Sequence, residues 1–259
     1  GKNLAMGENT IANAELAALQ GNISEGRNGH VANVSARSAS VGGIDTAVVD
    51  AQSAQANSLN VQYGIDDQSI SASADHASIS KVDSDYADAS SVNINNLNVN
   101  SQEDALSVSS DSVNIGQLDS NYADAQSVNI DNFNIDSHGK GIFATAGSLD
   151  FNQVTSDYAN AQTLNLDNFD LKSQSQGLSA SSDSITADKF DSEYVDANSI
   201  SLGNVDTNFD WSNTLGVSSA IHSVDASGVS AAGNNLGTVK GSGLKSDFSG
   251  RNSELSASV

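Results

Sequence analysis

Acidic side chains recur beside a tyrosine at a fixed spacing, and this pattern is the strongest candidate for chemistry in the chain. The signature reads DSDYADASSVNI over residues 83–94 and returns as DSNYADAQSVNI, TSDYANAQTLNL and DSEYVDANSISL. Carboxylate oxygens are the hard ligands that Ca²⁺ prefers. The sequence has neither EF-hand spacing nor the nonapeptide of calcium-binding β-rolls. The candidate calcium ligands are Asp83, Asp85, Asp88, Asp119, Asp124, Asp191 and Asp196.

These acids have a simpler competing interpretation as solvated turns. Asn160 replaces the aspartate at one copy of the second acidic position, and Thr155 replaces it at one copy of the first. Like charges on neighbouring strands also repel each other unless water or a cation screens them. A continuous calcium ladder is therefore interrupted. Calcium is the single cofactor that the pattern allows, and otherwise we expect none.

The tyrosine of the signature recurs without drift. Successive copies lie 36 residues apart, at Tyr86, Tyr122, Tyr158 and Tyr194. A fixed period of this length is typical of repeat architectures, in which equivalent residues form ladders. We expect the four rings to form a structural ladder that closes one corner of the core. The functional alternative is an aromatic strip that binds carbohydrate.

No catalytic signature is present. Serine is abundant, but no G-x-S-x-G nucleophile motif occurs, and the three arginines lie outside the regular copies. The four histidines, His30, His76, His138 and His222, are scattered without metal-pair spacing. The sole tryptophan, Trp211, lies in a disrupted repeat, where it is either a capping residue or a binding residue. We expect a protein that is not an enzyme.

Composition excludes several classes of partner. The 259 residues carry a formal net charge of −22, with 10 Lys and Arg against 32 Asp and Glu, which excludes nucleic acid because phosphate binding needs clustered basic residues. No apolar run reaches the roughly 20 residues of a membrane span. The absence of cysteine fits an extracellular or cell-surface protein, and the chain opens at Gly1 without a signal-peptide pattern, as a processed mature form does.

The elements that position the signature are predicted to be short strands. Val92-Asn93-Ile94-x-x-Leu97 is answered by Val113-Asn114-Ile115-x-x-Leu118 in the same copy, so each 36-residue repeat contains two half-repeats of about 18 residues. Apolar residues alternate with polar ones as in a strand, and the x-x step breaks the alternation as a corner does. The sequence therefore predicts an all-β fold, a β-solenoid whose coils contain either 18 or 36 residues.

The repeat sets the predicted domain boundaries. Residues 1–20 are an N-terminal arm or a degenerate first repeat, with a short helix at residues 11–19 as the competing interpretation. Residues 21–236 form the repeat domain, which is most regular over residues 87–194. Residues 237–259 lack the signature, and we expect a C-terminal tail or cap.

The stacked repeats rich in Ser, Asn and Gly over residues 11–236 resemble those of secreted bacterial β-solenoids. That group includes curli-like functional-amyloid fibre subunits and adhesin passenger regions, and the resemblance is one of style rather than of motif. It implies a non-enzymatic subunit of an extracellular fibre or biofilm-matrix filament that self-associates head to tail. The alternative is a calcium-dependent or carbohydrate-binding adhesin that recognises a surface polysaccharide.

Overall fold

The computed structural model describes residues 4–6, 9–26, 29–46, 49–211, 216–249 and 252–258, and every regular element in them is a β-strand. The all-β prediction is therefore confirmed. The chain divides into an N-terminal unit, residues 1–121 and 131–139, and a C-terminal unit, residues 122–130 and 140–259. The strands of the N-terminal unit are β1 (Leu4–Met6), β2 (Asn9–Ala12), β3 (Glu15–Ala17), β4 (Gln20–Gly26), β5 (Gly29–Asp45), β6 (Val49–Gly64), β7 (Ile70–Ser84), β8 (Ala87–Gln102), β9 (Ala105–Ile115) and β10 (Gln117–Ser120).

The remaining strands include one that both units share. Strand β11 (Ser127–His138) begins in the C-terminal unit and ends in the N-terminal unit. The other strands of the C-terminal unit are β12 (Gly141–Thr155), β13 (Ala159–Gln174), β14 (Gly177–Ser192), β15 (Val195–Asp210), β16 (Gly216–Ala231), β17 (Asn234–Ser249) and β18 (Asn252–Ser258).

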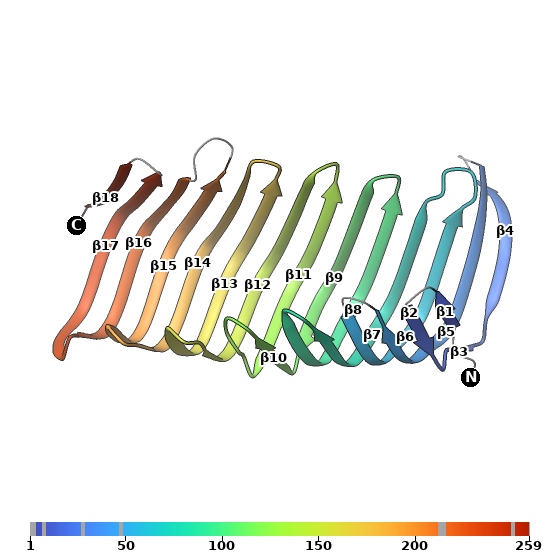
Figure 1. Ribbon diagram of the computed structural model, residues 1–259, viewed down its shortest axis with the longest axis horizontal. Helices are drawn as coiled ribbons and strands as arrows, with labels where there is room; N and C mark the ends of the chain where they lie inside the picture. The colour runs from blue at the N-terminus through green and yellow to red at the C-terminus, as the bar shows by residue number, and fades with distance from the viewer. Residues whose placement is uncertain are drawn as a thin grey trace. The chain divides into compact units, whose positions relative to one another are not determined.

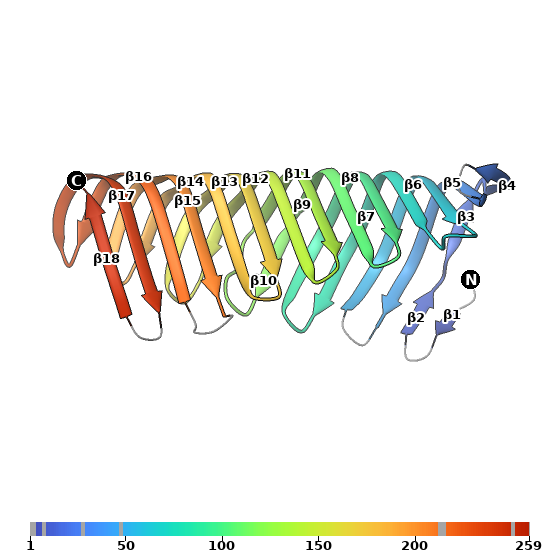
Figure 2. The same ribbon diagram turned by 90° about the horizontal axis from the view of Figure 1, so that it is seen from above.

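Consecutive strands pair antiparallel through hairpins (Figures 1 and 2). In the C-terminal unit β12 pairs with β13, β13 with β14, and so on to β18, and the N-terminal unit has the same arrangement from β5 to β9. Each half-repeat is one long strand with its turn, because β13, β14 and β15 begin 18 residues apart, at Ala159, Gly177 and Val195. The 36-residue repeat is thus a pair of antiparallel strands.

This pairing differs from the stacked coils that the sequence suggested. A coil and a pair of antiparallel strands both place residues 36 positions apart in one row, so the period alone does not distinguish them. The direction of the neighbouring strand decides between them, and it is antiparallel in both units, as for β7 with β8 and β13 with β14. Antiparallel neighbours need only a short hairpin turn, whereas parallel neighbours need a longer crossover.

Residues in the left-handed backbone conformation interrupt the long strands, and the ribbons curve near their lower ends in Figure 1. One such residue lies in the x-x step of each V-x-I-x-x-hydrophobic segment on alternate strands: Asn96, Asn132, Asn168 and Asn204, with φ between 48° and 53°. Asparagine tolerates this conformation better than most residues with a Cβ atom. The interruption therefore falls where the broken alternation predicted a corner.

Small and large side chains face each other across the strands at these bends. Ala146 lies directly opposite Phe169, and Ser182 lies opposite Val205. Ala146 and Ser182 are buried. In the N-terminal unit Ala74 stands opposite Leu97 in the same way. Each large residue thus packs beside a small one, as close packing in a curved sheet requires.

The strand of residues 9–26 is broken into β2, β3 and β4 but still pairs antiparallel with its neighbour. Strands β2, β3 and β4 pair in succession with β5, separated at Asn13 and Ala18, whose φ values are 51° and 53°. Residues 9–26 therefore behave as one bent strand where a helix was the competing interpretation. At the other end of the chain, β17 and β18 continue the antiparallel order through residues 234–258, although these residues lack the sequence signature.

Candidate functional sites: the tyrosine turns and the open sheet edges

The serine of the signature holds the hairpin turn that precedes β8. Ser84 Oγ donates a hydrogen bond of 2.7 Å to the carbonyl oxygen of Ala87 and accepts the N–H groups of Ala87 and Tyr86 at 3.1 and 3.4 Å. Asp88 Oδ1 accepts the backbone N–H of Ser84 at 3.2 Å. This serine and this aspartate therefore satisfy the backbone groups of the turn.

The same hydroxyl arrangement recurs at other copies of the turn. Ser156 Oγ donates to the carbonyl of Ala159 at 2.8 Å, and Ser192 Oγ donates to that of Val195 at 2.8 Å. In an earlier turn of the chain a threonine takes this role, with Thr46 Oγ1 donating to the carbonyl of Val49 at 2.7 Å. Sequence reasoning missed this role. The signal was available in the constant hydroxyl residue two positions before each tyrosine.

The four tyrosines lie in the turns and point into solvent. Their exposed fractions run from 72% to 86%, at Tyr86, Tyr122, Tyr158 and Tyr194. They therefore do not close a corner of the core, contrary to what we expected from the sequence. Residues in equivalent turns are two strands apart, a separation of about 10 Å, which is too wide for ring-on-ring stacking. The small alanines beside them take the inward positions, with Ala125 and Ala197 buried.

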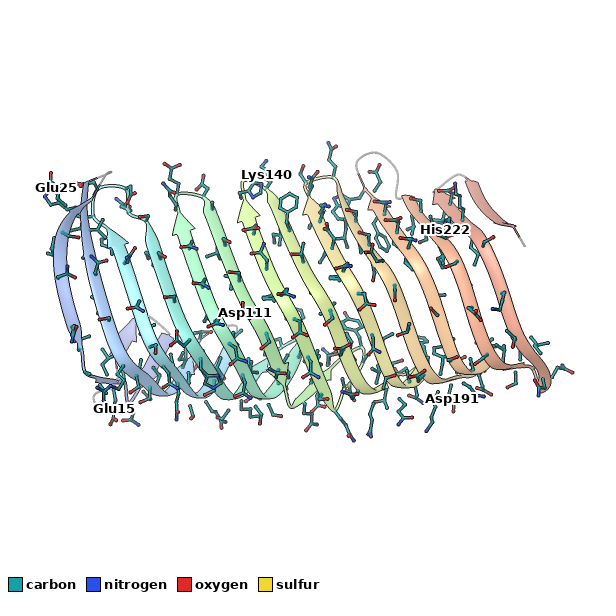
Figure 3. The ribbon with its side chains drawn as sticks, turned by 180° about the vertical axis from the view of Figure 1, so that it is seen from behind. Glu15, Glu25, Asp111, Lys140, Asp191 and His222 are labelled. Atoms are coloured by element: carbon teal, nitrogen blue, oxygen red, sulfur yellow. The ribbon has the colours of Figure 1, made fainter. Side chains whose placement is uncertain are left out.

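The candidate calcium ligands lie at this tyrosine end of the strands. Asp119 is directly opposite Asp88, and Asp191 is directly opposite Asp196, so these pairs bring like charges together on one face. Figure 3 shows Asp191 at the lower end of its strand. Asp85 lies in the turn before β8, and Asp124 forms backbone hydrogen bonds with Thr155. Among the described residues, no group of three or more acidic or histidine side chains could hold a metal ion.

One acid of the signature has a cationic partner instead. Lys81 Nζ lies 2.5 Å from Asp83 Oδ1. This contact raises the pKa of Lys81. Elsewhere in the N-terminal unit, hydrogen bonds from the Ser107 and Asn134 side chains lower the pKa of Asp136. Asp83 and Asp136 thus each find a donor within the protein, as polar groups in folded proteins usually do.

The scattered histidines and the tryptophan do not come together as a site. His30 contacts Asp66, and His76 Nδ1 lies 3.0 Å from Asn95 Oδ1. Trp211 is half-exposed at the end of β15, where its Nε1 donates to the carbonyl of Ser175 at 3.2 Å. Trp211 therefore covers a neighbouring hairpin turn.

The outer edge of the N-terminal unit is open. Strands β3 and β4 pair with β5 on one side, and no described strand pairs with them on the other. Leu16, Leu19 and Ile23 lie along this edge and are exposed, with Ile23 reaching 70%. Leu16 and Ile23 lie directly opposite Ala39 and Ala32 of β5. We call residues 15–25 the N-edge.

The outer edge of the C-terminal unit is open over half of its length. Strand β18 pairs with Ser242–Ser249 of β17, and within the described residues no strand covers the outer side of residues 234–241. Exposed apolar side chains also occur along β17, at Leu236, Val239 and Phe248. We call residues 234–249 together with β18 the C-edge.

The charges of the two edges differ. The N-edge is acidic, whereas the lysines Lys240 and Lys245 of the C-edge are balanced by Asp247 and Glu254. Glu15 and Glu25 lie on the N-edge, along the outermost strand of their unit in Figure 3. On the C-edge, β17 carries Lys240 and Lys245, and Lys240 Nζ lies 2.7 Å from Asp225 Oδ2 on the adjacent strand. Basic residues are rare in this chain, so two of the ten falling on one edge strand is notable.

No known protein indicates what these sites do. Among the described residues, no helix is long and apolar enough to cross a membrane. No protein-family model, no curated protein and no solved structure matches the chain.

Proposed function

We propose that this protein is a non-enzymatic subunit of an extracellular fibre or surface filament, in which copies join head to tail through the N-edge and the C-edge. The observation that carries the proposal is the pair of open edges. Each presents unpaired backbone N–H and C=O groups beside exposed apolar side chains such as Ile23 and Leu236. Natural sheets usually block such edges with inward charges, proline or short strands, because open edges recruit further strands.

Edges of this kind favour a polymer over a closed dimer. The N-edge and the C-edge are different surfaces, so a contact between them is heterologous and leaves one free edge of each kind on the assembly. Heterologous contacts that do not close into a ring generate filaments. The fibre in this proposal is built from antiparallel strands rather than from stacked coils.

The remaining properties of the chain agree with a role outside the cell. It contains no cysteine and carries a net charge of −22, which keeps isolated subunits soluble. Many side chains on the outward rows are Ser, Asn and Asp, which need no partner beyond water. The proposal therefore places the protein in the extracellular matrix or at the cell surface.

Electron microscopy of the purified protein tests the proposal. Negative staining at rising protein concentration should show unbranched filaments, both with calcium and with EDTA. Dispersed single particles at high concentration under both conditions would overturn it.

A second candidate function, binding of a surface polysaccharide, is favoured by the exposure of the tyrosines. Tyr158 and Tyr194 present their rings on turns two strands apart, and flat sugar faces pack well on such rings. The acids beside them, such as Asp191, favour a neutral polymer over an acidic one. Retention of the protein on insoluble neutral polysaccharide, lost in Tyr158→Ala/Tyr194→Ala, would support this function. Equal retention of the double variant would remove it.

A further inference from the structure

The half-strands β1 and β18 cover different parts of their neighbours, and this difference suggests how two copies join. We propose that β18 of one copy and β1 of the next copy lie end to end and form one composite strand between β17 of the first copy and β2–β4 of the second. This inference rests on the proposed function, since it assumes head-to-tail assembly. It adds which segments pair and in which register.

The two neighbouring strands can be compared residue by residue because each has a left-handed residue at its bend. The strand of residues 9–26 has left-handed residues at Asn13 and Ala18, and β17 has them at Gly237 and Gly243. The later of each two, Ala18 and Gly243 with φ values of 53° and 63°, marks the bend. In each strand the bend lies nine residues after the first residue, Asn9 or Asn234, so the two strands can be aligned in the same sense. Position counted from the bend therefore gives a common scale for both edges.

On this scale the two half-strands do not overlap. Strand β18 pairs with Ser242–Ser249, which is from one residue before the bend of β17 to six residues after it. Strand β1 pairs with residues 9–11, which lie nine to seven residues before the bend in the strand of residues 9–26. The part of β17 that β18 leaves uncovered includes the positions nine to seven residues before the bend, which are the positions that β1 covers on β2. Conversely, the part of the strand of residues 9–26 that β1 leaves uncovered includes the positions that β18 covers on β17.

The directions of the half-strands are compatible with a single strand. Strand β1 runs antiparallel to β2, and β18 runs antiparallel to β17. When β2 of one copy and β17 of the other are aligned in the same sense, β1 and β18 also run in the same sense. Joined end to end, they would make a strand antiparallel to both neighbours, which is the pairing found throughout the chain.

The composite strand also brings opposite charges together. Glu15 lies three residues before Ala18, and Lys240 lies three residues before Gly243, so both fall in the interval that neither half-strand covers. Across one intervening strand position their Cα atoms would be about 10 Å apart, within reach of the two long side chains. The joint would thus bring Glu15 of one copy near Lys240 of the other, where Lys240 already contacts Asp225 within its own copy.

The register predicts which residues meet at the joint. Ser256 of β18 is paired with Lys245, two residues after the bend of β17. In the strand of residues 9–26 the equivalent residue is Gln20, two residues after Ala18. Ser256 of one copy should therefore lie opposite Gln20 of the next. Directly opposite residues in antiparallel strands have Cα atoms about 4.5–5.5 Å apart, a distance that a disulfide can bridge.

Cysteine cross-linking tests this register, because the chain has no cysteine of its own. Full-length Gln20→Cys and Ser256→Cys proteins are mixed, allowed to assemble and oxidised, and the products are separated under denaturing, non-reducing conditions. The expected product is a covalent dimer that neither variant forms alone. The matched control replaces Gln20→Cys by Ser24→Cys, which is displaced by about 13 Å along the strand and should give no dimer.

The outcomes separate this inference from the proposed function. Filaments in which Gln20→Cys and Ser256→Cys do not cross-link, or in which Ser24→Cys cross-links instead, would overturn the composite strand and leave the fibre intact. Absence of filaments from the unmodified protein would overturn the proposed function, and the composite strand with it.

Discussion

The side-chain amide of Asn168 donates a hydrogen bond of 2.9 Å to the carboxylate of Asp183 across β13 and β14, at the residue where β13 enters the left-handed conformation. The N-terminal unit repeats this relationship, with Asn96 donating to Asp111 at 2.6 Å. The asparagine tolerates the backbone conformation, and the aspartate on the neighbouring strand accepts its amide hydrogen. Together they stabilise the bend of the strand pair.

Removal of this asparagine should destabilise the protein through two separable effects. Asn168→Ala loses the hydrogen bond and places a strained residue at φ of 50°, so we expect the free energy of unfolding to fall by about 1–2 kcal/mol. Asn168→Gly loses only the hydrogen bond, so its free energy of unfolding should fall by about half as much. Urea unfolding measures both, with Gln162→Ala, an exposed residue of the same strand, as control. Equal losses for alanine and glycine would contradict the role of the left-handed backbone.

Packing at the bend predicts that small residues are required opposite large ones. Ala146→Leu places a large side chain beside Phe169, and overpacking should lower the free energy of unfolding by about 1–3 kcal/mol. Adding Phe169→Ala should recover part of this loss, because the pair then exchanges its volumes. Thr145→Leu, on the exposed side of the same strand, should change stability little. Strictly additive losses in the double variant would argue against direct packing.

The turns predict opposite behaviour for two residues of the signature. Ser156→Ala removes a hydroxyl that bonds to both backbone groups of Ala159, and should cost about 1 kcal/mol. Tyr158→Ala removes a ring that is 86% exposed, and its effect should stay within about 0.5 kcal/mol. Thermal unfolding of the two variants beside the unmodified protein compares them. A larger loss at Tyr158 than at Ser156 would mean that the ring has a structural role.

Like charges at the turn edge predict stabilisation when one is removed. Asp191 lies opposite Asp196, so Asp191→Asn should raise the free energy of unfolding by about 0.2–1 kcal/mol at low salt, and the gain should shrink as salt is added. Calcium at millimolar concentration should raise the melting temperature no more than magnesium at the same concentration. A rise specific to calcium that Asp191→Asn abolishes would instead support the calcium-dependent adhesin.

Much of the fold could be predicted from the sequence because the packing repeats. Alternating apolar residues such as Val92 and Ile94 identified strands, and the x-x step before Leu97 located the bend. The direction of neighbouring strands could not be predicted, since a row of residues 36 positions apart is the same in a coil and in a pair of antiparallel strands. The short hairpin that decides between them is held by a serine, Ser84, that looked like one of many in a serine-rich chain.

The candidate sites were harder to predict. Regular spacing suggested that Tyr86 closed the core, but spacing reports only that a residue occupies an equivalent place in each repeat, not whether that place faces inward. The open edges had no sequence signal of their own. Leu16 and Ile23 resemble ordinary inward-facing residues, and they are exposed only because no described strand follows on their outer side.

The open edges carry the proposed assembly, and one substitution tests them directly. Ile23→Lys places a charge on the N-edge without touching a hairpin, and lysine side chains on edge strands oppose further pairing. In sedimentation velocity the unmodified protein should show species that grow with concentration, and so should Tyr158→Lys, an exposed control in a turn. Ile23→Lys should remain a monomer at every concentration. Assembly of Ile23→Lys to the same extent as the control would contradict the account.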